Sequence, residues 1–454
     1  MERFDVVVIG GGAGGYSTAV TAAGLGLSTA LIEIGDIGGA CLNRGCVPAK
    51  AWISSAETVD MAAHMATLTR EPLAFSPDFG LAAEKQRAIV AQFKKSLETL
   101  IVKKGVQIIL GRARFQAPGE ISVETAEGPR ALGYRYAVIA TGSAPARLFN
   151  LSENAALTSD TIFNLSAPPK SLLIVGGGAI GCEFAGAMSR FGVEVTVVEL
   201  LPRLLPTEDF EVSATLEREF KKRKIKVVTG TRIEEIAEAD GGVTATLAGG
   251  VRLSAEKVLI SVGRRFVTEG LGLENVGVTL GARGEIDTDG QMRTSARNIF
   301  AVGDVAGKHL LAYTAYAEGR RVAEIIGGVD SPASNTPVPN TIFTIPEIGS
   351  VGVTEGSAPE GYVKGTFMFR ALARAHAAGE IAGFVKVVSD GASGRILGVH
   401  IIGPRATDLI HIAAVAMAAQ MTVKQLGEVI FSHPTFSEAL LEAVHDTHGA
   451  SIHK

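Results

Sequence analysis

Two cysteines, Cys41 and Cys46, have the clearest capacity for chemistry in this chain. They are about one helical turn apart, so their Cβ atoms can approach to disulfide distance if Cys41 opens a helix. A disulfide that closes so small a loop restrains the unfolded chain little and adds little stability. The pair therefore favours a redox centre that opens and closes; the alternative is two buried thiols packed as small hydrophobic side chains.

A glycine-rich loop, Gly10–Gly15, precedes the cysteines and has the pattern Gly-x-Gly-x-x-Gly. The first glycine allows a tight turn, the second lets a pyrophosphate approach the backbone, and the third lets helix pack on strand. We expect a buried strand over residues 3–10 and a helix over about 16–24, whose first amides face the phosphate. Glu33, at the end of a strand over 28–34, has the spacing of a ribose-binding acid. The alternative is a glycine-rich turn with a solvated glutamate.

The same unit recurs at Gly176–Gly181, between a strand over 171–176 and a helix over 183–191. The next strand, over 193–198, leads into Glu199, which stands as far from its loop as Glu33 does from the first. This duplication predicts two bound dinucleotides. Two prolines, Pro168 and Pro169, mark the linker before the second unit.

The rest of the chain supplies the elements that would hold these loops. Residues 50–105 are expected to be helical, and strands over 136–143, 257–263 and 298–304 each end near a glycine turn. Asp304 at the last of these could bind a sugar-like hydroxyl chain or cap the following helix over 312–326. After a proline-rich stretch at 332–339, alternating runs predict an antiparallel sheet over 362–369, 383–388 and 396–402. The apolar helix predicted over 406–419 must be buried, and an interface between two copies is a natural place.

We therefore predict an α/β protein with two Rossmann-like dinucleotide-binding domains and a C-terminal α+β dimerisation domain. The predicted segments are 1–147 for the first dinucleotide, with the helical insertion at 50–105; 148–268 for the second dinucleotide; 269–338 completing the first site; and 339–454 for the interface.

The composition agrees with a large multidomain protein. The 454 residues allow two to four domains, and a net charge of −4 gives no sign of a nucleic-acid-binding face. No apolar run is long enough for a membrane span, and no signal segment opens the chain. With only three cysteines, a cytoplasmic location is expected, where a disulfide is usually catalytic. Cys182 has no partner in sequence and is expected in the core.

Taken together, the motifs resemble the flavin-dependent pyridine nucleotide–disulfide oxidoreductases, over essentially the whole chain from Asp5 to Lys454. The segments that carry the resemblance are the two glycine loops, Cys41–Lys50, Ala140–Ser143, Gly303-Asp304, Val338–Glu347, His433–Glu438 and the tail Ser451–Lys454.

The resemblance implies oxidation of dihydrolipoyl groups on a carrier protein, with transfer of electrons to FAD and then NAD. Cys41 would exchange with substrate, and the Cys46 thiolate would contact the flavin. His433 would be the base that forms the attacking thiolate, oriented by Glu438. Lys50 would lie beside the flavin ring, paired with Glu183 near the nicotinamide. A packed turn histidine and solvated helix charges are the alternatives.

The implied cofactor-binding residues extend beyond the two loops. For FAD they are Gly10, Gly12, Ala13, Gly14, Gly15, Glu33, Gly39, Ala40, Lys50, Gly111, Thr141, Gly142, Ser143, Asp304, Leu310, Leu311, Ala312 and Tyr313. For NAD they are Gly176, Gly178, Ala179, Ile180, Gly181, Glu183, Glu199, Ile233 and Gly263. Glu199 favours NAD over NADP because a carboxylate repels a 2′-phosphate, although Arg203 follows four residues later.

Several positions depart from the family pattern. Ala40 replaces a usual threonine, Tyr313 a usual histidine, and Phe266-Val267 a usual Pro-Asn pair. Arg44 stands between the cysteines, where it could lower a thiolate pKa or meet an acidic partner.

The implied partners are a lipoylated carrier (a 2-oxoacid dehydrogenase E2 component, the glycine cleavage H protein or a similar carrier) and a second copy of the chain, which supplies His433 and Glu438. No metal, nucleic-acid or membrane partner is expected. Two alternatives stay open: a related FAD reductase with another disulfide or a metal as substrate, and a carrier-binding flavoprotein with little turnover.

Overall fold

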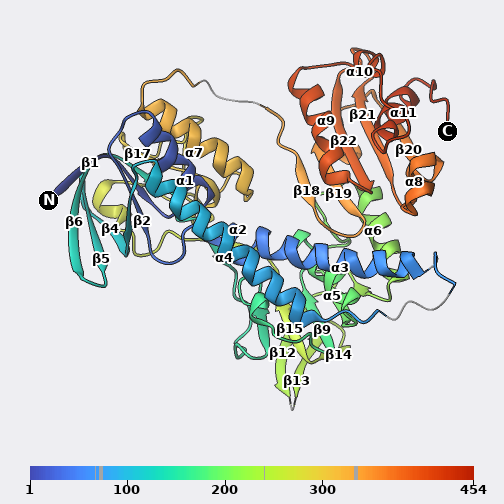
Figure 1. Ribbon diagram of the computed structural model, residues 1–454, viewed down its shortest axis with the longest axis horizontal. Helices are drawn as coiled ribbons and strands as arrows, with labels where there is room; N and C mark the ends of the chain where they lie inside the picture. Colours follow the sequence, from blue (N-terminus) through green and yellow to red (C-terminus); the bar gives the residue numbers. More distant parts are fainter. Residues whose placement is uncertain (67, 71–74, 240, 332–335) are drawn as a thin grey trace.

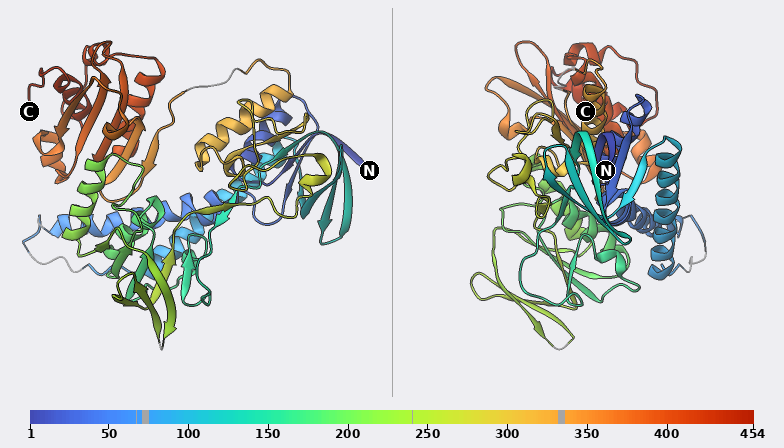
Figure 2. Two further views of the ribbon diagram at one scale, coloured as in Figure 1. Left: turned by 180° about the vertical axis from the view of Figure 1, so that it is seen from behind. Right: turned by 90° about the vertical axis from the view of Figure 1, so that its left-hand side faces the viewer.

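The structure is a computed structural model that describes residues 1–66, 68–70, 75–239, 241–331 and 336–454. It has three lobes, two built on parallel sheets and one on an antiparallel sheet (Figure 1). The first and third lobes stand apart, and the long helix α3 (Cys46–Ala66) runs from the first toward the third, past the second (Figure 2). The predicted proline-rich stretch lies partly outside the described residues.

The first lobe has a seven-stranded sheet in the order β3-β2-β1-β6-β5-β4, with β17 on β6. Its central strands are parallel, and β4 and β5 are antiparallel additions. Helices α1 and α7 pack on each other beside this sheet (Figure 1). The bounds are β1 (Glu2–Ile9), β2 (Thr29–Glu33), β3 (Gln107–Leu110), β4 (Arg112–Ala117), β5 (Glu120–Thr125), β6 (Gly128–Ile139), β17 (Ile299–Ala301), α1 (Ala13–Gly24) and α7 (Ala312–Ile326).

The second lobe repeats the parallel arrangement in the order β11-β10-β9-β15-β8, with an antiparallel sheet β12-β13-β14 attached. The bounds are β8 (Ala156–Thr158), β9 (Ser171–Val175), β10 (Glu194–Val198), β11 (Lys226–Val228), β12 (Ile233–Ala239), β13 (Gly242–Leu247), β14 (Arg252–Ala255), β15 (Lys257–Ile260), α5 (Ala179–Arg190) and α6 (Phe210–Lys222).

The third lobe is an antiparallel sheet in the order β18-β19-β22-β21-β20, with α9 on β19 and β22 and α11 on β20 and β21. The bounds are β18 (Asn340–Ile342), β19 (Glu347–Gly352), β20 (Tyr362–Met368), β21 (Phe384–Asp390), β22 (Ile396–Gly403), α8 (Ala373–Ala378), α9 (Ala406–Ala418), α10 (Val423–Gly427) and α11 (Glu438–Asp446). The helix predicted over 406–419 is buried on one face only, since Val415 is 68% exposed.

The remaining elements connect the lobes. The expected helical insertion is observed as α3 and α4 (Phe79–Lys103), and the short ladder between β7 (Ser143–Pro145) and β16 (Arg264–Phe266) joins the ends of the first two lobes. Short 3₁₀ turns complete the chain: η1 (Ile162–Asn164), η2 (Leu273–Val276), η3 (Gly303–Ala306), η4 (Glu355–Ser357) and η5 (Phe369–Ala371).

The starts of the two loop helices were predicted a few residues too late. Helix α1 begins at Ala13 and α5 at Ala179, each directly after the second glycine of its loop. The third glycine is therefore already helical, because it must bring the first helical turn against the strand. The resulting order confirms the predicted α/β class with two Rossmann-like units.

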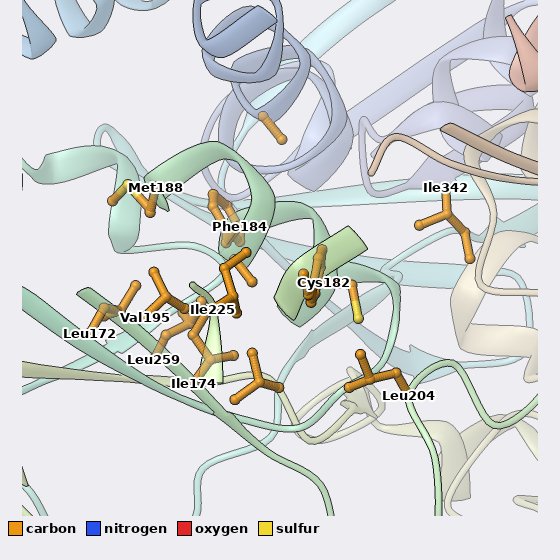
Figure 3. Packing of buried hydrophobic residues seen from close by; sticks show 14 of the residues in the cluster. Leu172, Ile174, Cys182, Phe184, Met188, Val195, Leu204, Ile225, Leu259 and Ile342 are labelled. Atoms are coloured by element: carbon orange, nitrogen blue, oxygen red, sulfur yellow. The ribbon is translucent and has the colours of Figure 1, made fainter. Parts of the chain in front are cut away.

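Cys182 lies in the hydrophobic core of the second lobe, as predicted. It is fully buried among side chains that include Ile174 and Leu204 (Figure 3), and its thiol donates to the Gly177 carbonyl at 3.3 Å. The packing also involves Ile342 from β18, so this core extends from the second lobe to the third. Over the described ranges, no helix combines the length and apolar character that crossing a bilayer requires.

Candidate active site

Cys41 and Cys46 lie on two successive helices rather than one. Cys41 is the third residue of α2 (Gly39–Arg44), and Cys46 opens α3 after a break at Gly45. The helix opened by a cysteine is therefore α3, which begins at Cys46. A Cβ on Gly45 would lie only 3.0 Å from the Ala40 carbonyl oxygen, so a glycine allows this close turn. Both cysteines are free thiols, which is the reduced form of a pair held within interaction distance.

The pKa values of the two thiols are shifted in opposite directions. The Cys41 thiol, which hydrogen-bonds Cys46, lowers the pKa of Cys46 to about 7; burial opposes this effect and the Lys50 ammonium adds to it. The pKa of Cys41 is raised, chiefly because its proton is shared with Cys46 and because the group is desolvated. In the reduced pair, Cys46 is therefore the more acidic thiol, and Cys41 keeps its proton to higher pH. A thiolate at Cys46 is the species that can give up electrons.

Lys50, one turn along α3 from Cys46, reaches across to the second lobe. Its Nζ lies 2.8 Å and 3.0 Å from the two carboxylate oxygens of Glu183 on α5. The Phe343 backbone amide donates to Glu183 Oε1 at 2.9 Å, and the Phe343 ring lies 4.5 Å below the ammonium. Three lobes thus meet at one ion pair. No local feature of the sequence indicated that Phe343 would contact this ion pair.

Both glycine loops have the cradle shape that a pyrophosphate needs. A Cβ on Gly15 would lie 1.8 Å from the Gly10 carbonyl oxygen, and one on Gly181 would lie 2.0 Å from that of Gly176. Gly10 and Gly176 have φ values of +103° and +105°, which side-chain-bearing residues rarely adopt. The two loops therefore fit a dinucleotide at the start of α1 and of α5.

Glu33 and Glu199 make matching contacts with these loops. Glu33 accepts hydrogen bonds from the amides of Gly11 (2.6 Å) and Gly35 (2.7 Å). Glu199 accepts from Gly177 (2.6 Å) and Leu201 (2.8 Å). Both carboxylates are nearly buried, so each is fixed at the edge of its loop, where a ribose would lie.

Arg203 does not compete with Glu199 for the cofactor. Its guanidinium donates to the carbonyls of Pro206 (2.7 Å) and Glu208 (3.0 Å). A guanidinium engaged with the backbone is not free for a 2′-phosphate, which favours NAD at this loop.

The other predicted flavin-side residues gather around the end of the first sheet. Ser143 Oγ donates to Asp304, and Arg264 Nε donates to Ser143 Oγ at 2.7 Å. Thr141 Oγ1 donates to the Val267 carbonyl at 2.6 Å. Asp304 is thus held by a side chain and is not a helix cap. Arg264 is a contributor that the sequence did not reveal.

The other residues predicted to bind the cofactors are described by their backbone positions. Gly39 lies against Gly12, where a Cβ would come within 2.6 Å of the Gly12 Cα, and the Gly111 amide donates to the Glu33 carbonyl at 2.8 Å. Leu310 and Leu311 precede α7, and Ala312 opens it. Ile233 opens β12, and Gly263 follows β15 with φ of +122°.

Arg44 contacts an acidic residue of the second lobe. Its Nε lies 3.3 Å from Asp160 Oδ2, whereas the charges that chiefly shift the pKa of Cys46 are those of Lys50 and Glu183. Asp160 also lies 3.8 Å from Arg264, so Arg44 belongs to a contact between α2 and the second lobe. Tyr313 donates its hydroxyl proton to the Pro339 carbonyl oxygen.

His433 and Glu438 form the predicted pair but lie away from the cysteines. His433 Nδ1 is 2.8 Å from Glu438 Oε1, and the Thr435 amide holds the other carboxylate oxygen at 2.7 Å. Helix α11 packs on β20, β21 and α10, whereas α2 packs on α3 and α4 (Figure 1). One chain therefore does not bring this histidine to its own thiols. The His433 side chain is 70% exposed and free to meet another surface.

Comparisons with known proteins agree with this geometry. The family model for pyridine nucleotide-disulphide oxidoreductases matches residues 4–319, and the model for that family's dimerisation domain matches residues 338–444. The dihydrolipoyl dehydrogenase of Chlorobaculum tepidum is 39% identical over 455 residues, covering 98% of this chain and 97% of that protein.

Two solved structures share the whole architecture. LpdA from Mycobacterium tuberculosis has a TM-score of 0.90 at 29% identity, and a Cu(II) complex of the HOCl-induced flavoprotein disulfide reductase RclA from Escherichia coli has 0.90 at 27%. Each match covers 98% of this chain and 99% of the other.

The chain belongs to the pyridine nucleotide-disulphide oxidoreductase family and carries its dimerisation domain. It is an oxidoreductase that uses FAD and NAD, as predicted.

Proposed function

We propose that this protein is a dihydrolipoyl dehydrogenase, which oxidises dihydrolipoyl groups on a carrier protein and reduces NAD. The observation that carries the proposal is the low-pKa Cys46 thiol beside the Lys50–Glu183 pair, at the junction of the two dinucleotide-binding lobes. The likeness to the C. tepidum enzyme over almost its full length supports it.

The exchange begins at Cys41. A substrate thiolate attacks the Cys41 sulfur of the oxidised pair, the Cys41–Cys46 bond breaks, and Cys46 leaves as a thiolate. The second substrate thiolate then closes the substrate disulfide and releases Cys41. Lys50 stabilises negative charge at Cys46, and Glu183 holds Lys50 in place. FAD held on the Gly10–Gly15 loop would supply an acceptor for the electron pair, and NAD held on the Gly176–Gly181 loop would supply the final acceptor.

The base in this scheme is His433 of a second copy of the chain. The exposed imidazole, held by Glu438, would take the proton from the attacking thiol. The separation of α11 from α2 within one chain and the dimerisation domain support a homodimer whose site is shared. The carrier is a lipoylated protein, and the low cysteine count supports a cytoplasmic location.

We assign residues 1–147 and 269–338 to the FAD-binding domain, 148–268 to the NAD-binding domain and 339–454 to the interface domain. The β17–β6 pairing supports joining the first two segments into one lobe, since β17 comes from the segment 269–338.

Anaerobic mixing with dihydrolipoamide and NAD tests the function directly. The wild-type protein is expected to reduce NAD, and Cys41→Ser and Cys46→Ser are expected to abolish turnover. Cys182→Ser is the matched control, because this thiol is buried in the core and donates only to a backbone carbonyl. A wild-type flavoprotein that fails to reduce NAD with any lipoyl substrate would reject the proposal.

A reductase acting on a metal is the second candidate, motivated by the Cu(II) complex of RclA. Among the residues that the structure describes, no group of three or more histidine, cysteine or acidic side chains could hold a metal ion. Copper-dependent oxidation of NADH exceeding lipoamide-dependent turnover would favour this candidate.

A further inference from the structure

An open hollow lies on the first lobe, at the end of β17 away from Asp304. It has a volume of about 790 Å³, and side chains from β6 and from the chain that leads into β17 line it: Arg135, Tyr136, Asp289, Arg293, Arg297 and Asn298. Asn298 precedes β17 and Asp304 follows it, so the hollow is at the opposite edge of the sheet from the predicted flavin-side residues. The proposed dithiol chemistry uses none of the lining side chains.

Two of the three arginines in this hollow lie over aromatic rings. The Arg135 guanidinium carbon is 5.3 Å from the centre of the Tyr136 ring. The Arg293 guanidinium carbon is 4.9 Å from the centre of the Phe300 ring, which is fully buried. The two ring centres are 6.4 Å apart. Because a cation is attracted to the face of an aromatic ring, both guanidinium groups have preferred positions at the wall of the hollow.

Backbone hydrogen bonds fix the same segments. The Asp289 carboxylate accepts from the backbone amides of Gln291 (2.7 Å) and Arg293 (2.9 Å), and the Asp289 amide donates to the Arg293 carbonyl at 3.0 Å. The side-chain amide of Asn298 donates to the Arg135 carbonyl at 3.0 Å. The hollow is therefore built by contacts between two segments that are far apart in the sequence.

The three arginines have no acidic partner. Over the part of the chain that the structure describes, no carboxylate oxygen lies within 4.0 Å of a guanidinium nitrogen of Arg135, Arg293 or Arg297. The pKa of Asp5 is lowered chiefly by hydrogen bonds from Ser28, and the charge of Arg135 adds least to this effect. The positive charge in the hollow is thus left for a ligand.

The charge and the size of the hollow fit a phosphate monoester. Three guanidinium groups and the one carboxylate of Asp289 leave a net charge of +2. A phosphate monoester carries about −1.5 to −2 at pH 7 and offers three strong acceptor oxygens. The planar fork of a guanidinium binds such oxygens in pairs. The volume falls within the range of about 300–1,000 Å³ that is typical of small-molecule sites, so the hollow has room for more than a bare phosphate ion.

We propose that this hollow binds a small phosphate monoester, whose phosphate group is held by Arg135, Arg293 and Arg297. The site is separate from both glycine loops, so it goes beyond the proposed function and does not depend on it. Binding is non-covalent and stabilises the folded protein.

Calorimetric titration of the FAD-loaded protein with glycerol 3-phosphate tests the proposal. Saturating NAD is present to fill the second glycine loop, and glycerol is the uncharged reference. We expect a dissociation constant below about 1 mM and a rise in the midpoint of thermal unfolding. Arg293→Met and Arg297→Met are each expected to weaken binding about tenfold. Arg297→Lys is expected to weaken it about threefold, because lysine keeps the charge and lacks the fork.

Arg130→Met is the matched control. It removes an arginine from the same strand, β6, outside the hollow, where Arg130 lies 2.9 Å from Glu2. Flavin absorbance checks that each variant is folded, and Arg297 is exposed, so its substitution keeps the test open if Arg293→Met does not fold.

Three outcomes would overturn the proposal. The first is the absence of binding, or equal affinity in the wild type and in Arg297→Met. The second is an equal loss in Arg130→Met, which would indicate only a general attraction of anions to the surface. The third is tighter binding of a single-stranded oligonucleotide than of glycerol 3-phosphate, which would indicate a nucleic-acid surface instead. NAD reduction by dihydrolipoamide is expected to be unchanged in all these variants, since none of the substituted residues contacts the thiols or the glycine loops.

Discussion

The Lys50 ammonium lies 2.8 Å from the Glu183 carboxylate, and this contact joins the helix that starts at Cys46 to the helix that starts at the second glycine loop. The pair stands between a sulfur that donates electrons and the loop expected to hold the nicotinamide cofactor. Its two charges act on Cys46 in opposite directions, because Lys50 lowers the pKa of the thiol and Glu183 raises it.

Substituting the two partners separately is therefore expected to move the Cys46 pKa in opposite directions. Lys50→Met is expected to raise it above about 7, and Glu183→Gln to lower it. A titration of the thiolate absorbance in the two-electron-reduced enzyme measures both shifts. Turnover is expected to fall at least tenfold in Lys50→Met, since the thiolate loses its cation. Shifts of the same sign in both variants would contradict this electrostatic account.

Glu199 is expected to set the preference for NAD. Glu199→Ala removes the acceptor for two loop amides and for the ribose hydroxyls, so the KM for NAD is expected to rise about tenfold, the effect of one or two hydrogen bonds to a charged group. The loss of negative charge is expected to improve NADP relative to NAD. The control is Glu33→Ala, which makes the matching contacts at the first loop and is expected to weaken retention of FAD instead. Steady-state kinetics with both nucleotides and FAD release on dilution separate the two effects.

Glu438 is expected to act through His433. In Glu438→Gln the imidazole keeps a hydrogen-bond partner but loses a negatively charged neighbour, so the protonated imidazole is less stable. We expect the rate of reduction by dihydrolipoamide to fall about tenfold, because the imidazolium that forms when His433 takes the proton loses its counter-charge. His433→Gln is expected to cost more, because the base itself is lost. The reverse order of effects would show that Glu438 has a separate role.

A buried lysine holds the second and third lobes together. Lys386 on β21 is fully buried, and its Nζ lies 2.8 Å from Asp209 and 2.8 Å from Glu355. Lys386→Met leaves the buried Asp209 carboxylate without its cation, so the free energy of unfolding is expected to fall by about 3–5 kcal/mol. Lys364→Met removes an exposed partner of the same Glu355 and is expected to cost about 0–1 kcal/mol. Denaturant unfolding measures both, and equal losses would show that burial does not matter here.

The same cluster predicts how stability depends on pH. Burial opposes ionisation of Glu355, but hydrogen bonds from Lys364 and Lys386 outweigh it and lower its pKa from 4.5 to about 2. The pKa of Asp209 is lowered as well: burial raises it, but the hydrogen bond and charge of Lys386 and the amides of Glu211 and Glu355 together outweigh burial. The folded protein thus binds fewer protons than the unfolded chain, so the stabilisation is full above pH of about 4.5 and is lost as the pH falls toward about 2. Lys386→Met is expected to flatten this part of the profile in denaturant titrations.

The two glycine loops, the acids Glu33 and Glu199, and the cysteine pair could be predicted from the amino-acid sequence alone, because each depends on residues close together in the chain. Local spacing fixes a strand–loop–helix unit, and only glycine fits Gly10 and Gly176 at positive φ. Even the helix over 312–326 was predicted at its observed limits.

Which charged side chains lie near the thiols depends on the tertiary structure. Arg44 is only two residues from Cys46 in sequence, yet its side chain contacts Asp160. Lys50 and Glu183, which come from different lobes, shift the pKa of Cys46. The contact of Phe343 with Lys50 and the buried Lys386 cluster likewise come from segments far apart in the chain. The physical reason is that electrostatic effects depend on distance and burial in space, which neither composition nor local periodicity records.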